Sequence, residues 1–164
     1  MPRKDEMLFE DWKKEYEKIL LSKKYSEASA IIGECYRNPT IESVKRAYAS
    51  VMDYVTSIPL PINEEKTRKK FLKPLDEISQ IIYGVDSPEV NKLCQKYKVV
   101  RKPERVGIKI VKTIHNLPNL IKALRDVLIQ AGDFSTSKGL RVTLSQKKKI
   151  GMERILEEEG IDDL

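Results

Sequence analysis

Hydrophobic residues recur at intervals of three and four positions through most of the chain, which is the pattern of amphipathic α-helices. The first such stretch, residues 6–22, is expected to be a helix whose apolar face anchors it in the core. That face comprises Leu8, Phe9, Trp12, Tyr16, Ile19 and Leu20. Ser26 is expected to cap a second helix, which ends near residue 37 before the breaking sequence Asn38-Pro39-Thr40.

Three more helices are predicted in the first 98 residues, over 40–56, 63–83 and 88–98. Thr40, Asn63 and Ser87 stand at their starts, and side-chain oxygens of these types cap helix N-termini. Pro88 occupies the favoured first helical position. Pro74 lies inside the second of these helices, and we expect it to kink or split that helix because proline has no amide hydrogen to donate.

The segment from residue 103 to residue 116 admits two interpretations. As a helix it would present an apolar stripe of Val106, Ile110 and Ile114. As a strand it would use the alternation of Val106, Ile108 and Ile110. The helix is the favoured interpretation, and the strand is its alternative.

The last part of the chain predicts one strong helix followed by weaker elements. Pro118 opens a helix over 118–131, which Gly132 is expected to end, and residues 133–139 read as a loop. Residues 140–144 alternate like a short strand, and a last helix is expected over 145–159.

The elements together predict a mostly all-α fold of six to eight helices, with a short β element near 140–144 as its exception. We expect residues 1–98 to form an antiparallel helical bundle core, with the basic helical segment 99–149 packed on it. Residues 150–164 would supply the last helix and an acidic tail. A chain of 164 residues suits one compact domain.

Several classes of protein are excluded by composition. The longest apolar runs span only a few residues, whereas a membrane-spanning helix needs about 20, so no membrane partner is expected. No apolar secretion segment follows the start, which favours a cytoplasmic or nucleoid-associated location. Cys35 and Cys94 are isolated, so they are expected to be reduced, buried thiols. Richness in Lys, Glu and Ile is typical of thermophiles, in which a disulfide between these two cysteines is the alternative.

The sequence also predicts no enzyme, no cofactor and no small-molecule substrate. His115 is the only histidine, so a histidine-rich metal site cannot form, and phosphate-binding glycine motifs are absent. Either cysteine could form a nucleophilic Cys–His pair with His115 only if the fold happened to bring the two side chains together. Two carboxylate pairs at helical spacing could share a metal, but chains this charged produce such pairs by chance. The pairs are Asp11 with Glu15 and Glu153 with Glu157.

Charge is distributed unevenly along the chain, and this distribution is the strongest indication of function in the sequence. Residues 1–91 carry 15 basic and 16 acidic side chains, whereas residues 92–149 carry 15 basic and 3 acidic ones. Residues 150–164 carry 1 basic and 6 acidic side chains, which brings the net charge of the whole chain to +6. A local charge of +12 over 92–149 attracts polyanions, and nucleic acids are the commonest polyanions that such segments meet.

Two basic clusters are therefore the candidate nucleic-acid-binding sites. The first comprises Lys98, Arg101, Lys102, Arg105, Lys109 and Lys112, of which the last three would share one helical stripe. The second comprises Lys138, Arg141, Lys147, Lys148 and Lys149. Few aromatic residues lie among these cations, which favours contacts to a duplex backbone over stacking on single strands.

The predicted function is non-catalytic binding of duplex DNA or RNA with weak sequence preference, as a subunit of a nucleoprotein assembly. The alternative is a helical adaptor whose basic face meets an acidic protein, and a solvated lysine face without a ligand is the structural explanation that competes with both. In the acidic tail, Ile161 and Leu164 are candidate anchors for a protein partner. Residues 27–52 carry a weak helix-turn-helix pattern, but their near-neutral charge favours an ordinary helical hairpin.

Overall fold

The computed structural model describes residues 4–60 and 64–140 of the chain. Its elements are α1 (Lys4–Arg37), α2 (Ile41–Ser57), α3 (Glu65–Tyr83), α4 (Pro88–Tyr97), β1 (Val100–Val106), β2 (Lys109–His115) and α5 (Leu117–Ser137). The fold is mostly helical, as predicted. The described residues form five helices and one two-stranded antiparallel sheet, so the expectation of six to eight helices was too high.

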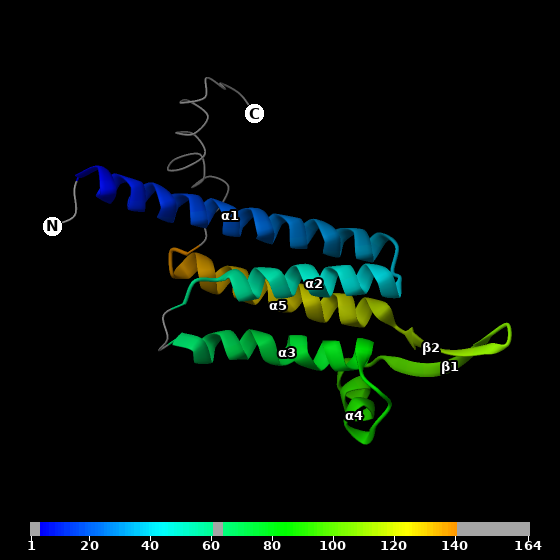
Figure 1. Ribbon diagram of the computed structural model, residues 1–164. Helices are drawn as coiled ribbons and strands as arrows, with labels where there is room; N and C mark the ends of the chain where they lie inside the picture. The colour runs from blue at the N-terminus through cyan, green and yellow to red at the C-terminus, as the bar shows by residue number, and fades with distance from the viewer. Residues whose placement is uncertain (1–3, 61–63, 141–164) are drawn as a thin grey trace.

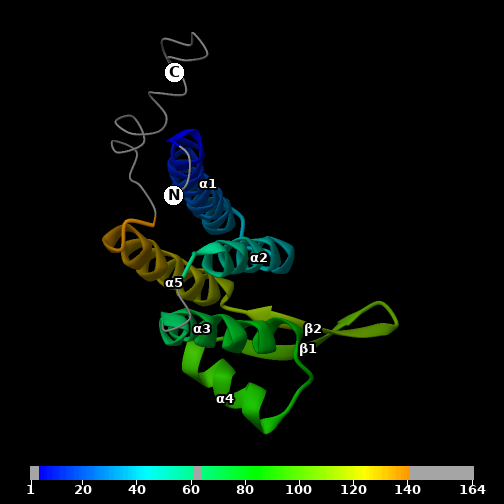
Figure 2. The ribbon, with the colours of Figure 1, turned by 60° about the vertical axis from the view of Figure 1, so that its left-hand side comes forward.

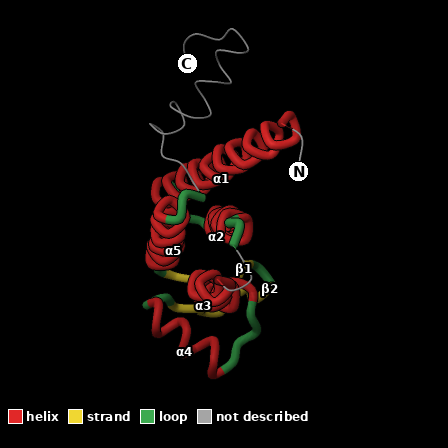
Figure 3. Tube along the Cα trace, turned by 90° about the vertical axis from the view of Figure 1, so that its left-hand side faces the viewer, coloured by secondary structure: helices red, strands yellow, loops and turns green. Residues whose placement is uncertain are grey.

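Four of the helices form a bundle, in which α2 and α5 lie between α1 and α3 (Figures 1 and 3). Apolar side chains at helical spacing fill the space between them. Val44 and Val51 come from α2, Ile78 comes from α3, and Leu120 and Leu124 come from α5; all five are fully buried. The bundle therefore draws its core from both halves of the chain.

The first two predicted helices are one continuous helix, α1, because no glycine or proline interrupts residues 22–26 and Ser22 is itself buried. The assignment of Trp12 and Tyr16 to the core was wrong. Each is 46% exposed, and their rings stack on one another with centroids 5.4 Å apart. The N-terminal end of α1 extends beyond the other helices that the structure describes (Figures 1 and 3), which agrees with the exposure of these rings.

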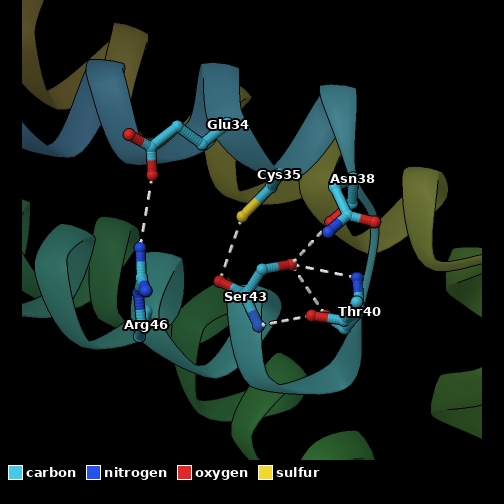
Figure 4. A network of polar contacts seen from close by, with 6 residues as sticks. All are labelled: Glu34, Cys35, Asn38, Thr40, Ser43 and Arg46. Atoms are coloured by element: carbon cyan, nitrogen blue, oxygen red, sulfur yellow. Dashed lines mark hydrogen bonds and ion pairs between the residues drawn. The ribbon is translucent and has the colours of Figure 1, made fainter.

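The turn between α1 and α2 is built as the sequence predicted, with Thr40 as the N-cap of α2. The hydroxyl of Thr40 accepts a hydrogen bond from the Ser43 amide, and the Ser43 hydroxyl accepts one from the Thr40 amide, each at 3.0 Å. Figure 4 shows this capping box together with the Cys35 thiol, which donates to the Ser43 carbonyl at 3.0 Å. The two helices run antiparallel side by side, which is the ordinary helical hairpin favoured for this stretch.

Proline and glycine did not end helices where the sequence suggested. Helix α3 continues through Pro74, because Phe71 before it and Leu75 after it are both buried against the bundle. Helix α5 continues through Gly132 to Ser137, so the loop predicted over 133–139 was wrong for its first five residues. A Cβ atom at Gly132 would lie 2.4 Å from the ring of Tyr25, so this glycine is a contact point between α1 and α5.

The segment 103–116 belongs to a β-hairpin, so the favoured helix was wrong and the alternative strand was right. Strands β1 and β2 pair in register from Val100 opposite His115 to Val106 opposite Lys109. Gly107 and Ile108 form the two-residue turn, and only Gly107 has a positive φ, of +65°. That combination is typical of a type II′ turn, which suits the twist of paired strands. The strand predicted over 140–144 and the helix over 145–159 lie, apart from Leu140, outside the described residues.

Candidate nucleic-acid interface

Helices α3 and α4 are joined by a four-residue turn, Gly84 to Ser87. Gly84 is required here, since a Cβ atom would lie 2.3 Å from the carbonyl oxygen of Gln80. Ser87 caps α4 by accepting a hydrogen bond from the amide of Val90 at 3.1 Å, as predicted. Helices α3 and α4 are therefore two consecutive helices joined by a short, well-defined turn.

Helix α4 has a buried face and a polar face. Val90 and Cys94 point into the core, and burial raises the pKa of the Cys94 thiol, which keeps it protonated. On the opposite side Asn91, Lys92 and Gln95 are exposed. Among the described residues these three side chains make no hydrogen bond or ion pair, so they are available to a ligand.

Glu77 of α3 fixes the C-terminal end of α4. Its carboxylate accepts from the ammonium group of Lys96 at 2.9 Å and from the hydroxyl of Tyr97 at 3.1 Å. Burial and the negative charge of Glu77 together raise the pKa of the Tyr97 phenol well above its usual range, so the phenol remains a donor. Helix α4 therefore has a fixed orientation on α3.

Asp86 in the turn between α3 and α4 holds the base of the hairpin. Its carboxylate pairs with the guanidinium of Arg101 in β1 at 3.2 Å and with the ammonium group of Lys112 in β2. The Lys112 hydrogen bond, with the charges of both cations, lowers the pKa of Asp86. Arg101 also donates to the carbonyl of Ile81 at 3.2 Å, and its side chain is only 9% exposed. The hairpin is thus attached directly to the turn between α3 and α4.

Beyond this attachment the hairpin stands away from the bundle as an arm, on the side of the molecule where α4 lies and away from α1 (Figures 1 and 2). Residues 102–110 are all exposed. Because partners in register share a face, Arg105 lies on the face of Arg101 and Lys112, whereas Lys102 and Lys109 lie on the opposite one. The single stripe predicted for Arg105, Lys109 and Lys112 on a helix was therefore wrong.

The first predicted cluster divides into two groups. Lys98, Lys102, Arg105 and Lys109 are exposed and form no ion pair among the residues the structure describes. Arg101 and Lys112 both pair with the single carboxylate of Asp86 and hold the arm in place. We call Lys102, Arg105 and Lys109 the arm cations, whereas Lys98 lies between α4 and β1.

The second predicted cluster is represented in the structure by Lys138 alone. Lys138 pairs with Glu64 at 3.4 Å, and its ammonium group lies 6.0 Å from the ring centroid of Phe134. It stands after the C-terminal end of α5, at the opposite end of that helix from the hairpin (Figure 1). Arg141, Lys147, Lys148 and Lys149 lie outside the described residues, as do the predicted partner anchors Ile161 and Leu164.

The polar face of α4 was not among the predicted site residues. The sequence carried a usable signal, because a short capped helix follows the apolar face of α3 after a turn that contains glycine. Its exposed positions hold Asn91 and Gln95, the two amide side chains that pair best with adenine edges.

Within residues 4–60 and 64–140, no helix is long and apolar enough to span a membrane, and no three His, Cys, Asp or Glu side chains gather as a metal site would require. Comparison of the chain with protein-family models, curated proteins and solved structures finds no match in any of the three.

Proposed function

We propose that this chain is a non-catalytic nucleic-acid-binding protein that binds a duplex through α4 and the hairpin. The observation that supports this proposal is the junction at Asp86, whose ion pairs join the hairpin that carries the arm cations to the turn that leads into α4. Cations without internal partners can neutralise phosphates and release condensed counterions, which supplies affinity without sequence information.

Duplex DNA is favoured over duplex RNA by the shape of α4. The major groove of B-form DNA admits an α-helix, whereas the major groove of A-form RNA is too narrow for side chains to read. Asn91 and Gln95 are four residues apart, so they lie about 6 Å apart along the helix axis, close to two base-pair steps. Both side chains can therefore face base edges that are two steps apart at once.

The proposal is tested by fluorescence anisotropy with one sequence prepared as duplex DNA, duplex RNA and single-stranded DNA. We expect duplex DNA to bind tightest, by about tenfold over duplex RNA. The variant Asn91→Ala/Gln95→Ala should reduce that preference, whereas Gln130→Ala, an exposed amide on α5, should leave it unchanged. Absence of binding to every probe at low salt would contradict the proposal.

The same cations could instead meet an acidic protein, which is the adaptor function predicted as the alternative. Competition separates the two, because an unrelated duplex displaces a ligand held by phosphate-binding cations and does not displace a partner recognised by its shape. A protein partner that persists against excess duplex would favour the adaptor.

A further inference from the structure

The free end of the hairpin carries apolar side chains where turns ordinarily carry polar ones. Ile108, the second residue of the turn, is 96% exposed, and Val106 and Ile110 beside it are 60% and 74% exposed. Turns favour Gly, Asn, Asp and Ser for conformational reasons that do not apply to isoleucine. Val106 and Ile110 lie on opposite faces of the hairpin, so Ile108 at the turn has one exposed apolar neighbour on each face. Exposed apolar side chains gathered at one end of an element mark binding sites more often than scattered ones do.

Cations surround this apolar tip on both faces of the hairpin. Arg105 is the cross-strand partner of Ile110 on one face, and Lys109 is the partner of Val106 on the other. A ribbon lying against a single nucleic-acid backbone would need cations on one face only. A ribbon inside a groove meets phosphates along both walls, so cations on both faces fit a groove better.

The dimensions of the arm are suitable for this placement. Each strand has seven residues, which corresponds to a length of roughly 23 Å. Both grooves of B-form DNA are roughly 8 Å deep, so the tip can reach the groove floor while Asp86 keeps the base of the arm attached. At the floor, the tip lies against the base-pair edges, where an apolar side chain can enter a base step.

We propose that the hairpin enters a groove of duplex DNA and that Ile108 inserts between adjacent base pairs as an apolar wedge, with Val106 and Ile110 flanking it on the two faces of the hairpin. This inference rests on the proposed function and adds that the bound duplex is distorted. Apolar side chains inserted at a base step partly unstack it and kink the duplex, and burial of the inserted side chain offsets part of the cost of unstacking.

The wedge is tested by energy transfer between dyes at the two ends of a short duplex. The tip variant, Val106→Thr/Ile108→Asn, keeps the shape of valine in the strand and places a turn-favouring residue at 108. Its control is Leu20→Gln, which removes an exposed apolar side chain from α1. We expect the wild-type protein and the control to shorten the end-to-end distance. The tip variant should bind with the same salt dependence, but the end-to-end distance of the duplex should stay at its value without protein.

A duplex with one central mismatch provides a second readout, because its step is already partly unstacked. The wild-type protein should bind it about tenfold tighter than the matched duplex, and the tip variant should bind both equally. Amide exchange over residues 100–115 verifies that the tip variant retains the hairpin; if it does not, Ile108→Asn alone takes its place.

The outcomes distinguish the wedge from the proposed function. Binding by the wild-type protein without shortening and without mismatch preference would overturn the wedge and leave the proposed function standing, as would a tip variant that still bends the duplex. A different result would assign the tip to a membrane surface and overturn the wedge. In that case the wild-type protein leaves the duplex unbent and binds vesicles of anionic lipid, and the tip variant no longer binds those vesicles. Absence of any duplex binding by the wild-type protein would overturn both proposals.

Discussion

The helical bundle and the α4–hairpin unit, residues 88–115, are stabilised in different ways. In the bundle, buried aliphatic side chains from four helices contact one another, and the polar pair Tyr54–Ser135 is fully buried with its oxygens 2.5 Å apart. The α4–hairpin unit has two buried residues on α4, and the arm itself is attached through ion pairs to Asp86. Hydrophobic burial barely responds to salt and pH, whereas exposed ion pairs respond to both.

This difference separates stability from binding. An isolated two-stranded hairpin is at best marginally stable in water, so the arm depends on its attachment to keep its cations beside α4. The bundle can tolerate loss of that attachment, because its core draws nothing from residues 102–110. Changes in the bundle should therefore alter the free energy of unfolding, and changes in the arm should alter mainly local order and binding.

The largest expected effect is in the bundle, at Gly132. The change Gly132→Ala places a methyl group against the Tyr25 ring and should lower the free energy of unfolding by about 2 kcal/mol, the range seen for overpacked cores. Chemical denaturation followed by circular dichroism measures this. Tyr25→Leu in the same background should recover part of the loss, and an unchanged midpoint in Gly132→Ala would refute the close contact between α1 and α5.

Asp86→Asn should produce a smaller, local effect. Without the carboxylate, the nearly buried guanidinium of Arg101 loses its counter-charge, and amide exchange over 100–115 should accelerate several-fold while amides of α2 stay protected. Asp53→Asn, which removes a carboxylate paired with Lys24 between α1 and α2, is the matched control and should leave the hairpin unchanged. Equal rates of amide exchange in the hairpin of the two variants would show that the arm does not depend on Asp86 more than on an ion pair of the bundle.

Acid should detach the arm through the same residue. The pKa of Asp86 is lowered in the folded protein, so its contribution is complete above the unfolded carboxyl value of about 3.9 and is lost as the pH falls through the lower, folded value. Amide exchange in the hairpin should therefore rise between pH 5 and the acid limit, with pH-dependent intrinsic exchange subtracted, by roughly the amount seen in Asp86→Asn. If the protection of the hairpin changed with pH no more in the wild-type protein than in Asp86→Asn, Asp86 would not be the residue that holds the hairpin.

The smallest expected effect concerns the ends of two helices. Both α4 and α5 end in a Schellman arrangement, but α5 has Gly139 at the left-handed position, with φ +70°, and α4 has Lys98 there, with φ +56°. Lys98→Gly should stabilise the fold by about 0.5 kcal/mol, since glycine removes the left-handed strain but has more entropy to lose. Lys98→Ala keeps the strain and serves as the control. A gain of the same size in both variants would mean that strain is not the cause.

Helices with clear capping residues could be predicted from the sequence. Thr40 and Ser87 have both the right side chain and a following apolar periodicity, and the helices begin where these residues predict. The hairpin was harder, because Val106, Ile110 and Ile114 satisfy a helical spacing and Val106, Ile108 and Ile110 satisfy a strand spacing. Pairing between strands decided the outcome, and pairing is a tertiary property.

The basic character of the candidate site was visible in the sequence, but the separation of its cations into two groups was not. In the sequence, nothing distinguishes the cations Arg101 and Lys112 from Lys102 and Lys109. Only the fold brings Asp86 between the first two and leaves the others exposed. Gly132 was misread for a similar reason, since a glycine that ends a helix and a glycine that admits a neighbouring ring are identical in sequence.

The central claim is that the arm cations bind duplex phosphates, and the salt dependence of binding tests it most directly. Anisotropy with duplex DNA across a salt series compares the wild-type protein with Lys102→Ala/Arg105→Ala/Lys109→Ala and with Lys66→Ala/Lys69→Ala/Lys70→Ala. The second variant removes the same charge from the far end of α3. We predict that the slope of log K against log salt becomes shallower by about 3 in the arm variant and stays unchanged in the control. Equal slopes in the two variants would contradict the claim.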